Sequence, residues 1–429
     1  MKHLFITIML ASVSVATATA SAQGLKDAYK DYFTIGVAVN QRNVTNPDQQ
    51  ALICREFNSV TAENDMKPQP TEPRRGEFDF TRADRIADFC RRNGIKMRGH
   101  CLMWHAQIGE WMYKDNDGHL VSKDELFKRM REHIHAVVNR YKDVVYCWDV
   151  VNEAITDDRN AENPYRQSPF YQIAGDEFIA NAFRFAREAD PTNLLFYNDY
   201  NETDPVKSRR IFDMVKKMKA AGVPIDGIGM QGHYNIYGPR EEEIDAAIKL
   251  YKQVVNHIHV TELDVRANEE MGGALRFSQE GMEISDSLKQ HLADQYARIF
   301  RVLRQHKDVI ENVTFWNLSD RDSWLGPRNY PLLFDTDYQT KKAYDYVLNK
   351  RNPEWQLPDK PKPQPRPEGQ RAQQRRGPRA QQAERPPFQP ALAFPENANV
   401  KEDFKPSATN LARQDYPQVN SQGYVRFRM

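Results

Sequence analysis

Strand-like and helix-like patterns alternate along most of the chain, and this alternation restricts the possible folds more than any other feature. Eight short apolar runs have the composition of buried strands, and each is followed by a segment with apolar residues at helical spacing. Eight such repeats over about 325 residues predict a single (β/α)8 TIM barrel of the α/β class. The predicted strands are Tyr32–Val39, Ser59–Asn64, Lys96–Trp104, Val144–Ile155, Leu194–Tyr200, Gly227–Tyr234, His257–Val265 and Asn312–Asp320. The predicted helices are Gln49–Phe57, Arg82–Asn93, Leu126–Tyr141, Phe178–Ala189, Pro205–Ala221, Glu241–Tyr251, Leu292–Gln305 and Ala343–Leu348.

Two of the predicted strands carry polar residues that a buried strand does not normally contain. The run Val144–Ile155 is rich in valine and delivers Asn152 and Glu153, and the run His257–Val265 delivers Glu262. Functional groups of TIM barrels lie at the carboxyl ends of the strands, so both glutamates are expected at one end of the barrel. A single glutamate there is equally well explained as a salt-bridged rim residue. Two such glutamates, here 109 residues apart in sequence, provide the two carboxyl groups that a glycosidase requires for catalysis.

The two ends of the chain differ in composition from the middle. Residues 1–22 combine Lys2, the apolar run Leu4–Val15 and a small-residue cleavage pattern, which is typical of a secretory signal peptide cut before Gln23. We therefore expect an exported protein, in the periplasm or outside the cell. Residues 353–429 are rich in Pro, Gln and Arg and are predicted to be a disordered tail. Its removal after Asn352 is expected to leave activity and thermal stability nearly unchanged. The barrel is predicted to occupy residues 23–352.

Charge and hydropathy exclude several classes of protein. Lys and Arg number 60 against 59 acidic residues, so there is no global basic field of the kind that binds nucleic acid. From Arg351 onward there are 14 basic and 8 acidic residues, which leaves an acidic barrel and a basic tail. Beyond the predicted signal peptide, no apolar run approaches 18 residues, so no membrane span is predicted.

The four cysteines are Cys54, Cys90, Cys101 and Cys147. An even number in an exported chain permits three disulfide pairings. Free buried thiols are favoured, because a large core does not need covalent cross-links. Neither state gives the cysteines a catalytic role.

Short motifs near the predicted strand ends carry a resemblance to a known family. The segments W-D-V-V-N-E-A (148–154) and T-E-L-D (261–264) resemble those of glycoside hydrolase family 10, the endo-β-1,4-xylanases. Further matches are E-N-D-M-K (63–67), G-H-C-L-M-W-H (99–105), Y-N-D-Y-N (197–201) and Q-G-H (231–233). The resemblance covers Leu25 to Leu348 and implies a retaining endo-xylanase that hydrolyses internal bonds of xylan with no metal or cofactor. Its partners would be xylan and xylo-oligosaccharides, and we expect a monomer.

The resemblance also implies roles for individual residues. Glu153 would be the general acid/base and Glu262 the nucleophile, with His233 beside the nucleophile and Asn152 placed to hold the sugar 2-hydroxyl. The remaining residues would bind substrate: Glu63, Asn64 and Lys67 toward the non-reducing end, His100 at the cleavage site, Gln231 facing inward with His233, Trp316 and Trp324 as floor and roof, and Trp104 in support. Core packing is the plain alternative for each tryptophan.

Asn317 stands where the family commonly has glycine, and a side chain there would narrow the cleft beside Trp316.

His257 and His259 suggest a metal site because the two side chains share a strand face. Glu262 has the opposite parity, however, so simple alternation directs both histidines toward the helices and favours packing.

Three functions remain open on the sequence alone: a retaining endo-xylanase, a non-catalytic glycan-binding protein that keeps the cleft, and the same fold acting on another β-glucan or on aryl β-xylosides. The presence of both glutamates disfavours the binding protein, because the simplest loss of hydrolysis replaces one of them. An exocyclic hydroxymethyl group of glucose would have to fit against Trp324, which favours a xylose polymer.

Overall fold

The structure is a computed structural model, and it describes residues 23–268, 284–358, 405–406, 418–419 and 425–426. The predicted signal peptide and most of the predicted tail lie outside these residues. The chain forms two compact units, residues 1–359 and 360–429. In the described part of the chain, no helix has the length and apolar character needed to cross a bilayer.

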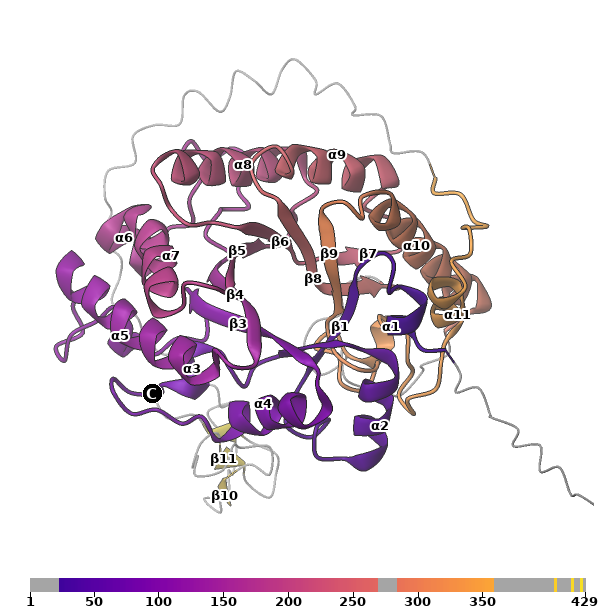
Figure 1. The fold of residues 1–429 in the computed structure, drawn as a ribbon, viewed down its shortest axis with the longest axis horizontal. Helices are drawn as coiled ribbons and strands as arrows, with labels where there is room; N and C mark the ends of the chain where they lie inside the picture. The colour runs from indigo at the N-terminus through magenta and orange to yellow at the C-terminus, as the bar shows by residue number, and fades with distance from the viewer. Residues whose placement is uncertain (1–22, 269–283, 359–404, 407–417, 420–424, 427–429) are drawn as a thin grey trace, which may run out of the picture. The chain divides into compact units, whose positions relative to one another are not determined.

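The first unit contains a closed barrel of parallel strands (Figure 1). The strands follow one another around the barrel in chain order, β9 pairs with β1, and β8 pairs with β6, which completes the circle. The predicted strand 227–234 is split into β6 and β7 at Gln231 and Gly232, and both parts pair with β8. The (β/α)8 prediction is therefore confirmed. The strands are β1 (Thr34–Val39), β2 (Ser59–Ala62), β3 (Lys96–Trp104), β4 (Val145–Asn152), β5 (Leu194–Asp199), β6 (Gly227–Met230), β7 (His233–Asn235), β8 (His257–Arg266) and β9 (Ile310–Phe315).

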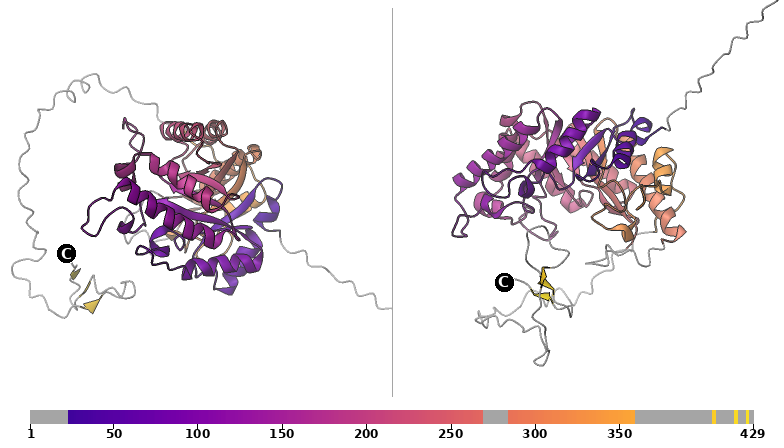
Figure 2. Two further views of the ribbon diagram at one scale, coloured as in Figure 1. Left: turned by 60° about the vertical axis from the view of Figure 1, so that its left-hand side comes forward. Right: turned by 90° about the horizontal axis from the view of Figure 1, so that it is seen from below.

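Helices surround the ring of strands, and the same arrangement can be followed in the two further views (Figures 1 and 2). They are α1 (Leu25–Ala28), α2 (Pro47–Glu56), α3 (Pro68–Thr71), α4 (Thr81–Asn93), α5 (Lys123–Tyr141), α6 (Pro169–Ala174), α7 (Glu177–Ala189), α8 (Pro205–Ala220), α9 (Glu241–Tyr251), α10 (Asp286–Gln305) and α11 (Lys342–Leu348). The described residues also include the short 3-10 helices Glu110–Met112 and Pro327–Asn329, which lie in loops.

Local sequence signals explain where the helices begin and end. The start of α8 is set by Asp204, whose side chain accepts hydrogen bonds from the amides of Val206 and Lys207, with Pro205 at the first helical position. The end of α4 is set by Gly94, which adopts a left-handed φ of 61°. The cap on α8 fixes the helical turn that carries Lys207.

A network of charged residues fills part of the barrel interior. Arg98 on β3 is fully buried and pairs with Asp149 on β4, and its guanidinium also lies 2.6 Å from Nδ1 of His259 on β8. Burial lowers the pKa of His259 to about 4, so this imidazole is neutral beside the arginine. Paired charges therefore occupy the barrel core below the cleft.

The expected orientation of His259 is wrong. Its ring lies 4.3 Å from that of Phe196 and beside Arg98 inside the barrel, and not toward the helices. The reason is that β8 departs from regular register between Ile258 and His259 and again between Val260 and Leu263. Such irregularities break strict alternation, so His259 and Glu262 both project inward. His259 is nevertheless a buried side chain packed among its neighbours, which is the role that the sequence favoured.

All four cysteines are free, as favoured by the sequence, and three of them are buried while Cys54 is partly exposed. The residues of the second unit that the structure describes form the short strands β10 (Lys405–Pro406), β11 (Gln418–Val419) and β12 (Val425–Arg426), which pair in antiparallel fashion.

The packed part of the first unit continues past Asn352, where the barrel was predicted to end. The backbone amides of Glu354 and Trp355 donate to the buried carboxylate of Asp294 on α10, at 2.7 and 3.1 Å. The Trp355 ring stacks on His291 with ring centroids 3.7 Å apart. Glu354 and Trp355 are thus attached to α10, which the composition of the tail did not predict.

Candidate active site

A cleft of about 700 Å³ lies at the carboxyl ends of the barrel strands. Every predicted site residue lines it: Glu63, Asn64, Lys67, His100, Trp104, Asn152, Glu153, Gln231, His233, Glu262, Trp316 and Trp324. Seven further lining residues were not predicted: Gln107, Tyr200, Asn201, Tyr234, Asp264, Arg266 and Leu325. Residues spread over some 260 positions of sequence meet here because parallel strands present the same end to one face of the barrel.

Glu153 follows the last residue of β4 and has a positive φ of 58°. Its carboxyl oxygens accept hydrogen bonds from Trp104 Nε1 at 3.0 Å, Gln231 Nε2 at 3.1 Å and Asn152 Nδ2 at 3.3 Å. All three donors are neutral. These donors fix the direction of the carboxyl group without bringing a positive charge into contact with it.

Glu262 lies on β8 in a different electrostatic environment. Oε1 accepts a hydrogen bond from Asn198 Nδ2 at 2.8 Å, and Oε2 lies 3.3 Å from His233 Nε2. Burial alone would raise the pKa of Glu262, but His100, His233 and Lys67 together hold it below its ordinary value. Glu262 is therefore ionised at neutral pH.

His233 is the positive partner of this carboxylate. Its Nδ1 lies 3.0 Å from Asp264 Oδ2, and the same oxygen accepts the indole N–H of Trp324 at 2.8 Å. Burial alone would lower the pKa of His233, but Asp264 and Glu262 raise it to about 10. The imidazolium thus links the nucleophile candidate to the tryptophan at the mouth of the cleft.

The other end of the cleft is built by the segment that follows β2. Lys67 Nζ donates to Asn64 Oδ1 at 2.9 Å and lies 4.8 Å from the centre of the Trp104 ring. Burial raises the pKa of Glu63, against the opposing effects of Asn317 and Lys67. Acidic, basic and amide groups can hydrogen-bond the hydroxyls of a sugar, and the adjacent aromatic ring can pack against the apolar face of the sugar ring.

The two predicted aromatic walls differ in exposure. Trp316 is 5% exposed and meets His100 edge to face at 5.2 Å, whereas Trp324 is 40% exposed. The hypothesis that Asn317 narrows the cleft is wrong: Asn317 is buried and is not among the residues that line the cleft. Its side-chain oxygen instead accepts the backbone N–H of Trp324 at 3.2 Å. Its φ of 97° explains why glycine suits this position.

Asn198 was not among the predicted site residues, yet it is hydrogen-bonded to two of them. Its amide group donates both to Asn152 Oδ1, at 2.9 Å, and to Glu262. A Cβ on Gly229 would fall 2.3 Å from Asn198 Oδ1, so glycine is required to leave room for this amide. The signal was present in Y-N-D-Y-N, where a polar residue interrupts a buried strand.

Comparison with known proteins agrees with this geometry. Residues 24–350 match the model of glycosyl hydrolase family 10. An endo-1,4-beta-xylanase/feruloyl esterase of Xylanibacter ruminicola is 49% identical over the whole of this chain, which spans 56% of that relative's length. An endo-1,4-beta-xylanase of Geobacillus stearothermophilus is 41% identical, with 77% of this chain and 99% of the relative covered.

Solved structures show the same relationship. A psychrophilic glycoside hydrolase family 10 endo-beta-1,4-xylanase is 65% identical with a TM-score of 0.73, covering 76% of this chain and 99% of that structure. Since the family model spans most of the sequence, the chain belongs to glycosyl hydrolase family 10.

Proposed function

We propose that the protein is a retaining endo-1,4-β-xylanase in which Glu153 is the general acid/base and Glu262 the nucleophile. The observation that carries the proposal is the contrast between two carboxyl groups in one cleft. Glu262 is held ionised by cationic neighbours, while the hydrogen-bond donors to Glu153 are all neutral. Double displacement requires one carboxylate and one carboxylic acid, and this contrast assigns the attacking carboxylate to Glu262 and leaves proton donation to Glu153.

In the first step, Glu262 attacks the anomeric carbon while Glu153 gives its proton to the departing oxygen. The glycosidic bond breaks, and an ester forms between Glu262 and the sugar. Asn152, His100 and Trp316 line the cleft, which supports contacts of the first two with hydroxyls of this sugar and of Trp316 with its apolar ring face. In the second step, Glu153 is ionised and takes a proton from the water that hydrolyses the ester.

Xylan is the proposed substrate because the named relatives act as xylanases and because of Trp324. The indole N–H of Trp324 is fixed on Asp264 and its backbone on Asn317, so the ring is held over the cleft. A hydroxymethyl group on a glucose unit would have to displace it. This supports a xylose polymer over another β-glucan.

Product analysis tests the proposal. Reducing-sugar assays are expected to show release from xylan and at most slight release from carboxymethyl cellulose. Proton NMR of the first products should show the β-anomer before mutarotation, and the two carboxyl groups should lie about 5–5.5 Å apart. Initial appearance of the α-anomer would exclude retention, and absence of hydrolysis would favour a glycan-binding protein.

Two further properties belong to this proposal. Export is supported by the pattern of residues 1–22, and amino-terminal sequencing of the mature protein is expected to begin at Gln23. We also expect a monomer, and sedimentation should give the mass of one chain.

A further inference from the structure

The backbone at Glu153 has a conformation that non-glycine residues avoid. Its φ of 58° lies in the left-handed region, so neighbouring groups must hold it there. The amide of Glu153 donates to the carbonyl of Asn198 at 2.9 Å, and its own carbonyl accepts Arg166 Nε at 3.0 Å. The next two amides, of Ala154 and Ile155, both donate to the Tyr197 hydroxyl, at 3.0 and 3.1 Å.

The Tyr197 hydroxyl can serve these amides only if its single proton points elsewhere. That proton goes to Asp199 Oδ2, 2.5 Å away. The other oxygen of Asp199 contacts Lys207 Nζ at 2.9 Å and accepts the amide of Tyr200 at 2.9 Å. Tyr197, Asp199 and Lys207 are all buried, so no bulk water competes for these bonds.

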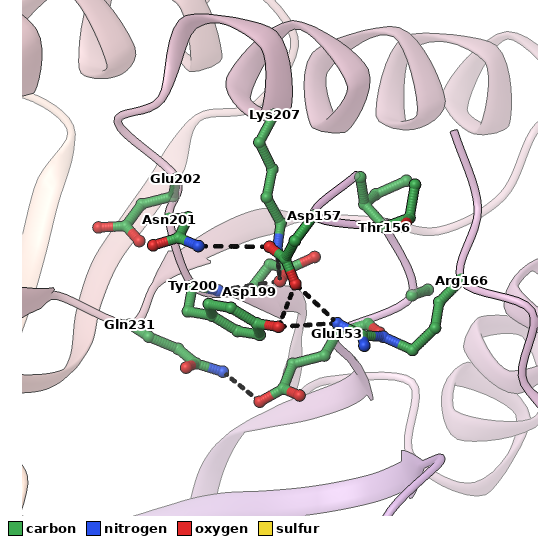
Figure 3. A network of polar contacts seen from close by, with 12 residues as sticks. Glu153, Thr156, Asp157, Arg166, Asp199, Tyr200, Asn201, Glu202, Lys207 and Gln231 are labelled. Carbon is green, nitrogen blue, oxygen red and sulfur yellow. Dashed lines mark hydrogen bonds and ion pairs between the residues drawn. The ribbon is translucent and has the colours of Figure 1, made fainter. Parts of the chain in front are cut away.

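A second branch of the network reaches the Glu153 backbone through Arg166 (Figure 3). Arg166, which holds the Glu153 carbonyl, also donates to the Tyr200 hydroxyl at 2.9 Å and pairs with Asp157 at 3.3 Å. Lys207 Nζ donates to the other oxygen of Asp157 at 2.7 Å. Both branches therefore meet at Asp157 and form one connected set of bonds around the Glu153 backbone.

We propose that Tyr197, Asp199, Lys207 and Arg166 are positioning residues for the acid/base, which fix the backbone at Glu153 so that its carboxyl faces the glycosidic oxygen. None of the four is among the residues that line the cleft. The inference rests on the proposed role of Glu153. It extends that role by stating which buried groups make proton donation efficient.

If the carboxyl group of Glu153 is misplaced, the loss of activity should depend on the leaving group of the substrate. A displaced acid harms only substrates whose leaving group needs a proton, because nucleophilic attack by Glu262 is unaffected. Tyr197→Phe removes the hydroxyl and keeps the ring. We expect kcat/KM for phenyl β-xylobioside to fall about 10- to 100-fold, the scale of a misplacement near 1 Å. For 2,4-dinitrophenyl β-xylobioside, kcat/KM should stay within about threefold, since general acid catalysis contributes little there.

Arg166→Gln provides an independent variant, because it removes the donor to the Glu153 carbonyl from the partly exposed side of the network. It should show the same selectivity even if Tyr197→Phe fails to fold. Tyr29→Phe is the matched control: its buried hydroxyl donates to the carbonyl of Val347 at 2.7 Å, on α11. Its kcat/KM should be unchanged with both substrates.

Glu153→Ala separates failure of the inference from failure of the proposed function. If Glu153→Ala shows no leaving-group selectivity, the acid/base role itself is wrong. If Glu153→Ala is selective but Tyr197→Phe and Arg166→Gln lose activity equally on both substrates, or lose none, the four residues do not position the acid.

Discussion

Removal of the six residues Pro353–Pro358 is expected to destabilise the barrel, although composition alone assigned them to a dispensable tail. The structure attaches them to α10 through Asp294, which is fully buried and accepts the amides of Glu354 and Trp355. Trp355 also stacks on His291, and its carbonyl accepts a hydrogen bond from Arg298. A chain ending at Asn352 loses all of these contacts.

The size of the effect follows from these contacts. Two hydrogen bonds to a carboxylate contribute about 4 kcal/mol and the aromatic stacking about 1 kcal/mol. Ordering Glu354 and Trp355 costs about 3 kcal/mol of chain entropy, which leaves a net stabilisation of about 2 kcal/mol. In a domain of roughly 330 residues the entropy of unfolding is about 0.7 kcal/mol per degree, so the melting temperature should fall by about 3 °C.

Differential scanning calorimetry on two truncated chains measures this difference. A chain that stops after Pro358 keeps the contacts and serves as the reference for a chain that stops after Asn352. Trp355→Ala keeps the backbone hydrogen bonds to Asp294 and should lose only about 1 °C. Melting temperatures of the two truncated chains within 1 °C of each other would refute the docking of this segment.

Three further predictions concern the barrel and the cleft. Arg98→Met leaves the buried Asp149 without its arginine and with only His100 still paired to it, and should cost about 3–5 kcal/mol in urea unfolding. Replacing Arg98 and Asp149 both by leucine should recover part of this loss, because His100 then loses its carboxylate partner. Because the pKa of His233 is raised to about 10, its charge stabilises the folded state fully below pH 6.5, and this contribution is lost as the pH rises through 10. The free energy of unfolding should therefore fall more steeply between pH 7 and 10 in the unmodified protein than in His233→Gln; parallel slopes would contradict this. Asn317→Gly frees the backbone of Trp324 and should raise KM for xylotriose about three- to tenfold with kcat nearly unchanged, and an unaltered KM would show that Asn317 does not hold this tryptophan.

The barrel and the cleft residues could be predicted because their signals are local. Each strand is a short apolar run between helical patterns, and each site residue follows such a run or lies near its carboxyl end. In a (β/α)8 barrel these ends share one face, so position in sequence translates directly into position in space. The predicted helix limits differ from the observed ones by a few residues, and the largest difference is at α10, which begins at Asp286 and not at Leu292.

What could not be predicted depends on irregular backbone and on distant contacts. The orientation of His259 is set by register shifts in β8, which leave no clear mark in H-I-H-V-T-E-L-D-V. The network around Glu153 depends on the positive φ of that residue, and local patterns favour such a φ only for Gly, Asn or Asp. The attachment of Trp355 depends on Asp294, 61 positions earlier in the chain.

The roles of the two glutamates are the central claim, and azide rescue of the two alanine variants tests them most directly. With an activated aryl xylobioside, Glu153→Ala should still form the glycosyl-enzyme, and azide, which needs no base, should restore turnover with a β-azide product. Glu262→Ala lacks the attacking group and should fail with every substrate, unless azide enters from the vacated side and gives an α-azide. Opposite stereochemistry of the two azide products is the result we predict. The same stereochemistry in both, or cleavage by Glu262→Ala at near the unmodified rate without azide, would contradict the assignment.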